Sequence, residues 1–331
     1  MAYTTGGTIQ AQDYNWLTWG GNTSGTYTEA VNNLAIIWGV GEGQKGYGQD
    51  VSAFSTVSAT NEVTAAQWSG FVYHLNKSLG HQGQTRLANG SNIGIVAGAT
   101  VEAFSNVSTA VTQINSTYLS HFAVGTKTTG SNLNETLSST TGLSIGTNYD
   151  VTVTFSSTDA ARYFFNAGGQ IKMTCSHPTG SGINLLFSDL ASNTGTVVQS
   201  APNSGTVSIA GSSYSGITKV GGGGNTPTVD ADKGYFGLTT ANATAFTQTA
   251  SSGPSGYLSS FIRYIVKSNG AQGSNGDTGD VITIFTIFDE IPDDLVASSG
   301  TAVTLTLQAP ETTNLSASWG TPTLASSVTG S

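Results

Sequence analysis

The chain has 331 residues and a formal net charge of −9, and only 9% of its residues are charged. A nucleic-acid surface needs clustered basic side chains, and the 10 Lys and Arg are scattered along the chain, so composition excludes that class. No apolar run approaches the roughly 20 residues that span a bilayer, and the single cysteine, Cys175, excludes an intramolecular disulfide.

The abundance of small residues favours a β-rich protein over a disordered one. The chain holds 43 Gly, but it also holds 5 Trp, 12 Tyr and 13 Phe. These aromatics recur in periodic segments, whereas disordered chains have few aromatics and a high net charge. Such a composition is typical of sheets with many turns and small polar side chains on the strand faces.

The start of the chain predicts short helices. Residues 13–19 are compatible with one helical turn. Residues 27–38 carry aromatic and aliphatic side chains at helical spacing, with Thr28 as the expected N-cap and Gly39 as the stop.

Two stronger helical patterns follow. Residues 64–79 place large apolar side chains on one face, Thr64 and Gln67 match a capping box, and Gly80 is the expected C-terminal cap. Residues 101–122 show a second apolar stripe. Amphipathic helices of this kind bury their stripes against each other, so we expect a helical N-terminal domain over residues 1–124.

A linker is expected over residues 125–148, which have no clear period. The period then changes to two over residues 149–155 and 171–175, as in half-buried strands. Between them, residues 166–169 read Asn-Ala-Gly-Gly and predict a hairpin turn, because Asn and Gly tolerate positive φ.

Further strands are expected over 183–187, 205–210, 261–267, 281–288 and 302–308. The segment 281–288 is apolar on both faces, which predicts a central strand covered on both sides. The predicted fold class is α+β, mostly β: a small helical region followed by an antiparallel β-sandwich or jelly-roll-like domain over 149–331. Residues 211–237 are either a long loop in that domain or a boundary between two smaller units.

Two strings resemble catalytic motifs without their structural context. Residues 142–146 match G-x-S-x-G, but a strand is expected after them where a nucleophile elbow needs a helix. Residues 41–46 match G-x-G-x-x-G, but they follow a helix rather than a strand. We interpret both as polar loops and expect no catalytic residue.

Neither the histidines nor the acidic residues predict a metal or cofactor site. His74, His81, His121 and His177 show no ligand spacing, and Cys175 is interpreted as a small buried hydrophobe. The acidic turns around residues 230–232, 277–280 and 289–294 are expected to be solvated, with bound Ca²⁺ as the alternative. No cofactor is expected.

Several longer strings carry a resemblance to a known family. They are residues 12–15, 43–49, 63–68, 81–83, 159–171 and 312–322. In this order they cover most of the chain, and the run at 159–171, DAARYFFNAGGQI, is the most specific. Together they resemble a family of virion structural proteins from tailed phages, common among cyanophages and marine phages.

The resemblance implies a component of the virion. Because the sequence shows no catalytic constellation, we expect this component not to be an enzyme. With the composition, the resemblance favours a neck, collar or tail-attached fibre or appendage, assembled in the host cytoplasm and docked on other phage virion proteins. A homo-oligomer is expected, with a trimer favoured by analogy. The alternatives are a capsid decoration or baseplate protein, and a receptor-binding protein or tailspike that binds a host surface glycan. Neither nucleic acid nor a membrane is expected as a partner.

The expected subunit interface is aromatic. Its candidate residues are Trp16, Trp19, Trp38, Tyr47, Phe164 and Phe165. The last two would point to opposite faces if residues 162–165 formed a strand, one into the core and the other into an interface. Packing within a single chain is the alternative, and burial of all six in one subunit would exclude the interface assignment.

Overall fold

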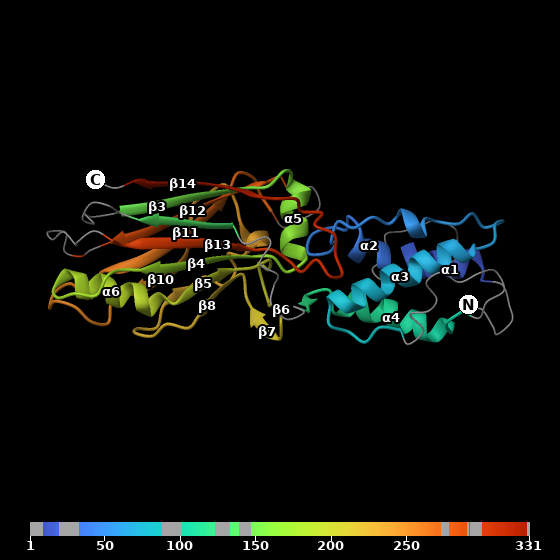
Figure 1. Cartoon of the computed structure of the whole chain (residues 1–331), viewed down its shortest axis with the longest axis horizontal. Helices are drawn as coiled ribbons and strands as arrows, with labels where there is room; N and C mark the ends of the chain where they lie inside the picture. Colours follow the sequence, from blue (N-terminus) through green and yellow to red (C-terminus); the bar gives the residue numbers. More distant parts are fainter. Residues whose placement is uncertain are drawn as a thin grey trace. The chain divides into compact units, whose positions relative to one another are not determined.

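The computed structural model describes residues 9–19, 33–87, 101–122, 133–138, 147–272, 278–289, 291 and 300–329. The chain forms two compact units (Figure 1). The first unit comprises Met1–Thr126, Ser208–Gly211 and Glu311–Ser318, and the second comprises Lys127–Val207, Ser212–Pro310 and Trp319–Ser331. The predicted division placed residues 208–211 and 311–318 in the β domain, but both segments pack with the helices.

The first unit is helical. Its helices are α1 (Ala11–Trp19), α2 (Leu34–Trp38), α3 (Ala65–His81) and α4 (Phe104–Ser116), with a 3₁₀ turn, η1 (Ser52–Phe54). Apolar side chains from all four α-helices are buried together, as expected for stripes that face one core. The two-residue strand β1 (Ser120–His121) pairs in parallel with β6 (Val207–Ile209).

The boundaries of these helices confirm some of the predicted signals and correct others. The capping box of Thr64 and Gln67 is present, and Gly39 ends α2 by donating its N–H to Ala35 O. Helix α2 starts only at Leu34, because Asn33 is extended and caps it; Thr28 and residues 27–32 lie outside the described residues. Gly80 does not end α3, which runs on to His81.

The second unit contains two larger sheets. One has six strands in the order β14-β3-β12-β11-β10-β9, and the other has five in the order β2-β13-β4-β5-β8. Figure 1 shows their strands as two layers. The strands of the first are β3 (Thr147–Thr154), β9 (Thr228–Val229), β10 (Ala243–Thr249), β11 (Phe261–Ser268), β12 (Val281–Asp289) and β14 (Thr323–Thr329). Those of the second are β2 (Leu133–Ser138), β4 (Gln170–Ser176), β5 (Thr196–Gln199), β8 (Ile217–Val220) and β13 (Ala302–Gln308).

The pairings within both sheets are antiparallel, which confirms the predicted α+β, mostly β fold. Strand β12 is internal to its sheet as predicted, but alternate residues are fully and partly buried, so it is not equally covered on both faces. Strand β2 lies inside the predicted linker 125–148, and β3 already begins there at Thr147. The remaining elements are β7 (Ser212–Tyr214), which follows β6 in a small sheet, and the 3₁₀ turn η3 (Tyr235–Gly237).

Two segments predicted as strands or a hairpin are helices. Residues 158–166 form α5 (Thr158–Asn166) and residues 183–194 form α6 (Ile183–Thr194). The N-cap Ser157 accepts a hydrogen bond from Ala160 N at 3.1 Å, which starts α5. Buried residues recur every three or four positions in α6, whereas α5 is buried at every position from Ala160 to Asn166. The predicted hairpin turn at 166–169 is therefore the end of a helix, where Gly168 adopts a φ of 91°.

Candidate functional site

Four of the six predicted interface aromatics lie in the core of their own unit. Trp38, Tyr47, Phe164 and Phe165 each have 2% or less of their surface exposed. A side chain buried in its own chain has no surface left for a partner, so the interface prediction is wrong for these four. Only Trp16, which is 40% exposed, and the partly buried Trp19 remain accessible.

The two accessible tryptophans lie on α1. Trp16 stacks on Phe104 at the start of α4, with ring centroids 6.0 Å apart and an interplanar angle of 29°. Trp19 donates from Nε1 to Phe54 O at 2.8 Å. Each is therefore held on one side by its own unit, and Trp16 presents its other side to solvent.

The most specific string of the resemblance builds an aromatic cluster. Phe164 and Phe165 pack against Phe155, and Phe165 stacks on Tyr235 with ring centroids 4.5 Å apart. The close approach at Gly169 fixes the turn after α5, because a Cβ there would lie 2.5 Å from the Phe164 ring. This string therefore specifies core packing rather than a surface.

Arg162 is buried beside this cluster. Its Nη2 lies 2.9 Å from Asp159 Oδ1, and its guanidinium carbon lies 5.1 Å from the centre of the Tyr163 ring. In a helix, residues three apart face the same side, which brings Asp159 and Arg162 together.

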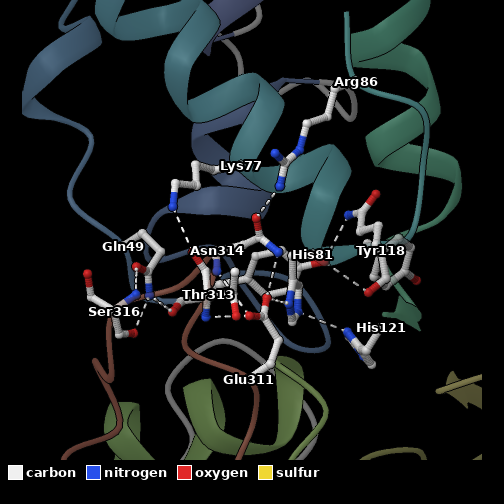
Figure 2. A network of polar contacts seen from close by, with 12 residues as sticks. Gln49, Lys77, His81, Arg86, Tyr118, His121, Glu311, Thr313, Asn314 and Ser316 are labelled. Atoms are coloured by element: carbon white, nitrogen blue, oxygen red, sulfur yellow. Dashed lines mark hydrogen bonds and ion pairs between the residues drawn. The ribbon is translucent and has the colours of Figure 1, made fainter. Parts of the chain in front are cut away.

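A network of polar contacts fastens the segment Glu311–Ser318 to the helices of the first unit (Figure 2). Its centre is the hydrogen-bonded pair of His81, at the end of α3, and Glu311. The distance from His81 Nδ1 to Glu311 Oε1 is 2.9 Å, and the two residues are 230 positions apart in the chain. Both are buried, His81 completely.

Glu311 accepts further hydrogen bonds from its own segment. Its Oε2 accepts from Thr313 N at 2.6 Å and Asn314 N at 3.0 Å, and its Oε1 accepts from Asn314 Nδ2 at 3.0 Å. Burial alone would raise the pKa of this carboxyl, but the hydrogen bond and charge of His81 together with the bonds from Asn314 lower it to about 2. Glu311 is therefore an anion at neutral pH and only accepts, so His81 Nδ1 carries the proton that joins them.

A second imidazole continues the row. His121 Nδ1 lies 3.2 Å from His81 Nε2, and His121 is 5% exposed. Tyr47 packs edge-on against both rings, with its centroid 4.8 Å from that of His81. Strand β1 carries His121, so its pairing with β6 fixes where this imidazole lies.

Two cations hold the outer part of the segment. Lys77 Nζ donates to Thr313 O at 2.7 Å, and Arg86 Nη2 donates to Asn314 Oδ1 at 2.7 Å. Lys77 lies on α3, the helix that carries His81, and Arg86 lies in the chain that follows this helix. Figure 2 shows these side chains converging on the segment.

Glutamines complete the network around the loop that follows α2. Gln49 bonds to Ser316 through both ends of its amide, and Ser318 Oγ donates to Tyr47 O at 2.7 Å. Gln82 Nε2 donates to the Tyr47 hydroxyl at 2.8 Å. Burial raises the pKa of the Tyr47 phenol and outweighs that bond, so the hydroxyl stays protonated.

The other histidines and the cysteine have separate environments. His74 lies among Trp38, Phe54 and Tyr73, and burial lowers its pKa. His177 lies in the β unit, with Nδ1 2.6 Å from Thr301 Oγ1. Burial of its sulfur raises the pKa of the Cys175 thiol, but the residue is only partly buried, whereas the sequence predicted a buried one.

The motif-like strings and the acidic turns contribute no further candidate site among the described residues. Residues 41–46 form a turn after α2, as predicted, and residues 142–146 lie outside the described residues. In the described part of the chain, no three His, Cys, Asp or Glu side chains gather as a metal site would require, and no helix is long and apolar enough to cross a membrane.

Sequence reasoning missed the partners of this network because they lie far apart in the chain. Three of the strings that carry the resemblance, 43–49, 81–83 and 312–322, nevertheless contribute to it. The presence of these three strings in one sequence was the signal that could have indicated the network. No protein-family model, curated protein or solved structure matches this chain.

Proposed function

We propose that this chain is a structural component of a tailed-phage virion, a neck, collar or tail-attached fibre or appendage that self-assembles and docks on the particle. The observation that carries the proposal is the way the two units are interleaved. The chain passes between them after residues 126, 207, 211, 310 and 318, five times in all. A building block of a particle has to keep its shape when force acts on it. A chain that passes repeatedly between its two units favours resistance to such force.

The polar network supports the same role. A load on the second unit reaches the segment Glu311–Ser318 through β13 and β14, which flank it in the chain. The segment is held by several hydrogen bonds from α3 and from the loop around Gln49. Forced unfolding is governed by the rate at which such contacts break, and contacts that must break together slow it.

Self-association is expected to use the accessible part of the aromatic set. Trp16 is the largest side chain among the exposed hydrophobics of the described residues. Tryptophan is the residue type most enriched among side chains that dominate binding energy at interfaces. A homo-oligomer, with a trimer favoured, would bury it against a second copy.

The proposal is tested on particles. Purified particles of the phage that encodes this chain should yield its peptides by mass spectrometry, in amounts that correspond to several copies of the chain per particle. Recovery of the chain only from the soluble lysate would contradict the proposal.

Two solution measurements then separate the roles within a virion. Light scattering at several concentrations should give the mass of a stable oligomer, whereas a persistent monomer favours a decoration or baseplate component that assembles only on a preformed lattice. Binding of the purified chain to host envelope polysaccharide would favour the receptor-binding alternative, and release of shorter sugars would favour a tailspike.

A further inference from the structure

Strand β14 forms one edge of the six-stranded sheet in the second unit (Figure 1). It pairs with β3 along its whole length, and no other described strand is hydrogen-bonded to it. Strand β2 of the other sheet lies close to β14 without pairing with it. Five of the six residues from Thr323 to Val328 are exposed. The outer side of β14 therefore offers main-chain groups with which a further strand can pair.

The other edges of the two larger sheets carry features that oppose a new strand. Strand β9 has two residues, β8 has four and carries Lys219, and β2 carries Glu135. Short length and charged side chains are the usual protection of an exposed edge. Strand β14 has seven residues, no shift of register against β3, and neither proline nor a charged residue within Thr323–Thr329. Among these four edges, only β14 is long and uncharged.

The side chains of β14 alternate between the two faces of the sheet. One set lies opposite residues of β3 that are at most 2% exposed, so this set is on the face that the core covers; its members are Leu324, Ser326 and Val328. Val328 is nevertheless 40% exposed. Ala325 and Ser327 lie on the opposite face and are exposed. The inward face of this edge thus has an apolar side chain that its own sheet leaves partly uncovered.

A second copy of β14 fits this edge in one antiparallel register. If Ser326 lies opposite Ser326 of the second copy, Leu324 lies opposite Val328 and Ala325 lies opposite Ser327. Apolar then meets apolar on the inward face, and small side chains meet on the outer face. A shift by two residues would place Ser326 opposite Leu324 or Val328, and a shift by one would pair side chains on different faces.

We propose that β14 is a self-association edge, at which two copies of this chain pair their β14 strands in the register centred on Ser326 and join their six-stranded sheets. The contact is isologous, because residue 324 of each copy meets residue 328 of the other. The net charge of −9 opposes association of two copies, and an uncharged edge adds no like-charge contact to that repulsion.

This contact goes beyond the proposed function and is separate from the one expected at Trp16. Trp16 belongs to the first unit and β14 to the second. The pairing holds whether or not the chain is a virion component. In an oligomer that forms through Trp16, it would add a twofold contact between two such oligomers.

Charges placed at Ala325 and Ser327 test the register, because the proposed pairing sets these two positions opposite each other twice per dimer. Ala325→Lys with Ser327→Lys creates like-charge pairs and should weaken dimerisation by about tenfold. Ala325→Lys with Ser327→Glu creates opposite-charge pairs and should keep or strengthen it. Sedimentation of the full chain over a dilution series measures both. All variants also carry Trp16→Ser, so that the contact expected there does not contribute.

Net charge distinguishes this contact from general repulsion. The double-lysine variant adds two positive charges to the net charge of −9, whereas the lysine–glutamate variant leaves it unchanged. General repulsion alone would therefore make the double-lysine chain the stronger associator, opposite to the proposal. The difference should shrink at about 1 M salt, where screening acts over about 3 Å. Equal association of the two variants, stronger association of the double-lysine chain, or a monomer at every concentration would overturn the proposal.

A disulfide trap reads the same register without added charge. Directly opposite residues of an antiparallel pair have Cα atoms about 4.5–5.5 Å apart, which a disulfide can bridge. Ser326→Cys should therefore give a covalent dimer on mild oxidation. The matched control is Ser327→Cys, whose two copies would lie diagonally at about 7–8 Å and should cross-link at least about tenfold more slowly. Both variants keep Cys175.

The outcome of the trap is independent of the test on particles. Equal cross-linking of Ser326→Cys and Ser327→Cys would overturn the β14 pairing. The virion proposal would then still stand, because it depends on recovery of the chain from purified phage. Absence of the chain from particles would leave the β14 pairing intact.

Discussion

Gln49 binds the main chain of Ser316 in the way a neighbouring strand would. Its Oε1 accepts from Ser316 N at 2.7 Å and its Nε2 donates to Ser316 O at 3.0 Å, although the residues are 267 positions apart. The Gln49 side-chain amide thus bonds to both main-chain polar groups of Ser316, a residue that lies between two strands and belongs to neither. This matters because an unpaired buried polar group costs more than a hydrogen bond contributes.

The first prediction follows from that contact. Gln49→Leu keeps the approximate volume but leaves Ser316 N and O without this partner, so we expect a loss of about 2–3 kcal/mol in the free energy of unfolding. Urea denaturation at pH 7 measures it. Gln10→Leu, at an exposed position, should change stability by less than about 0.5 kcal/mol. Equal effects of the two substitutions would contradict the role of Gln49.

The second prediction concerns pH. The folded chain lowers the pKa of Glu311 to about 2, so its ionised form stabilises the fold above about pH 4.5, and this stabilisation is lost as the pH falls towards 2. Glu311→Gln should cost about 1–3 kcal/mol at pH 7, and the difference from wild type should shrink below pH 4.5. Denaturation at a series of pH values measures it. Glu62→Gln, on the exposed surface, should show no such trend.

The third prediction tests whether Phe165 is core or interface. Its ring is 1% exposed and stacks on Tyr235, so Phe165→Ala should cost about 3–5 kcal/mol of stability without changing the mass of the folded chain in solution. Phe122→Ala, where 47% of the residue is exposed, is the matched control and should cost less than about 1 kcal/mol. A lower mass in solution, with an unchanged free energy of unfolding, would instead indicate that Phe165 lies at a subunit interface.

The fourth prediction concerns the accessible tryptophan. If Trp16 lies at the subunit interface, Trp16→Ser should weaken association by about tenfold or more, while thermal unfolding of the dissociated chain changes little. Light scattering over a dilution series measures it. Tyr73→Ser removes an aromatic of nearly the same exposure, 39%, from the same unit and should leave association unchanged. Equal effects of both would count against a specific site at Trp16.

How far the sequence predicted the fold depends on how local each signal is. The capping box at Thr64 and the strand expected over residues 261–267 are local signals, and both are confirmed. Helix α5 was missed because two adjacent phenylalanines suit a strand with two faces as well as they suit a helix. The N-cap Ser157, with apolar residues spaced by three and four, would have favoured the helix.

The candidate site was less predictable. His81 and Glu311 are 230 positions apart, and nothing in the pattern around either residue indicates the other. Residues 311–318 follow a strand and precede another, so a loop of the β domain was the natural expectation. Their contacts with the helices depend on tertiary packing, which periodicity does not report.

The interleaved chain also has a consequence for synthesis. Residues 1–126 leave the ribosome first, yet the unit they belong to also needs Glu311–Ser318. Ribosomes add about 5–20 residues per second. The synthesis of the chain between residue 126 and Glu311 therefore takes on the order of 10–40 seconds. During that interval His81 has no carboxylate partner and the Gln49 amide has no main chain to bind. A product truncated before Glu311 would therefore never complete its first unit.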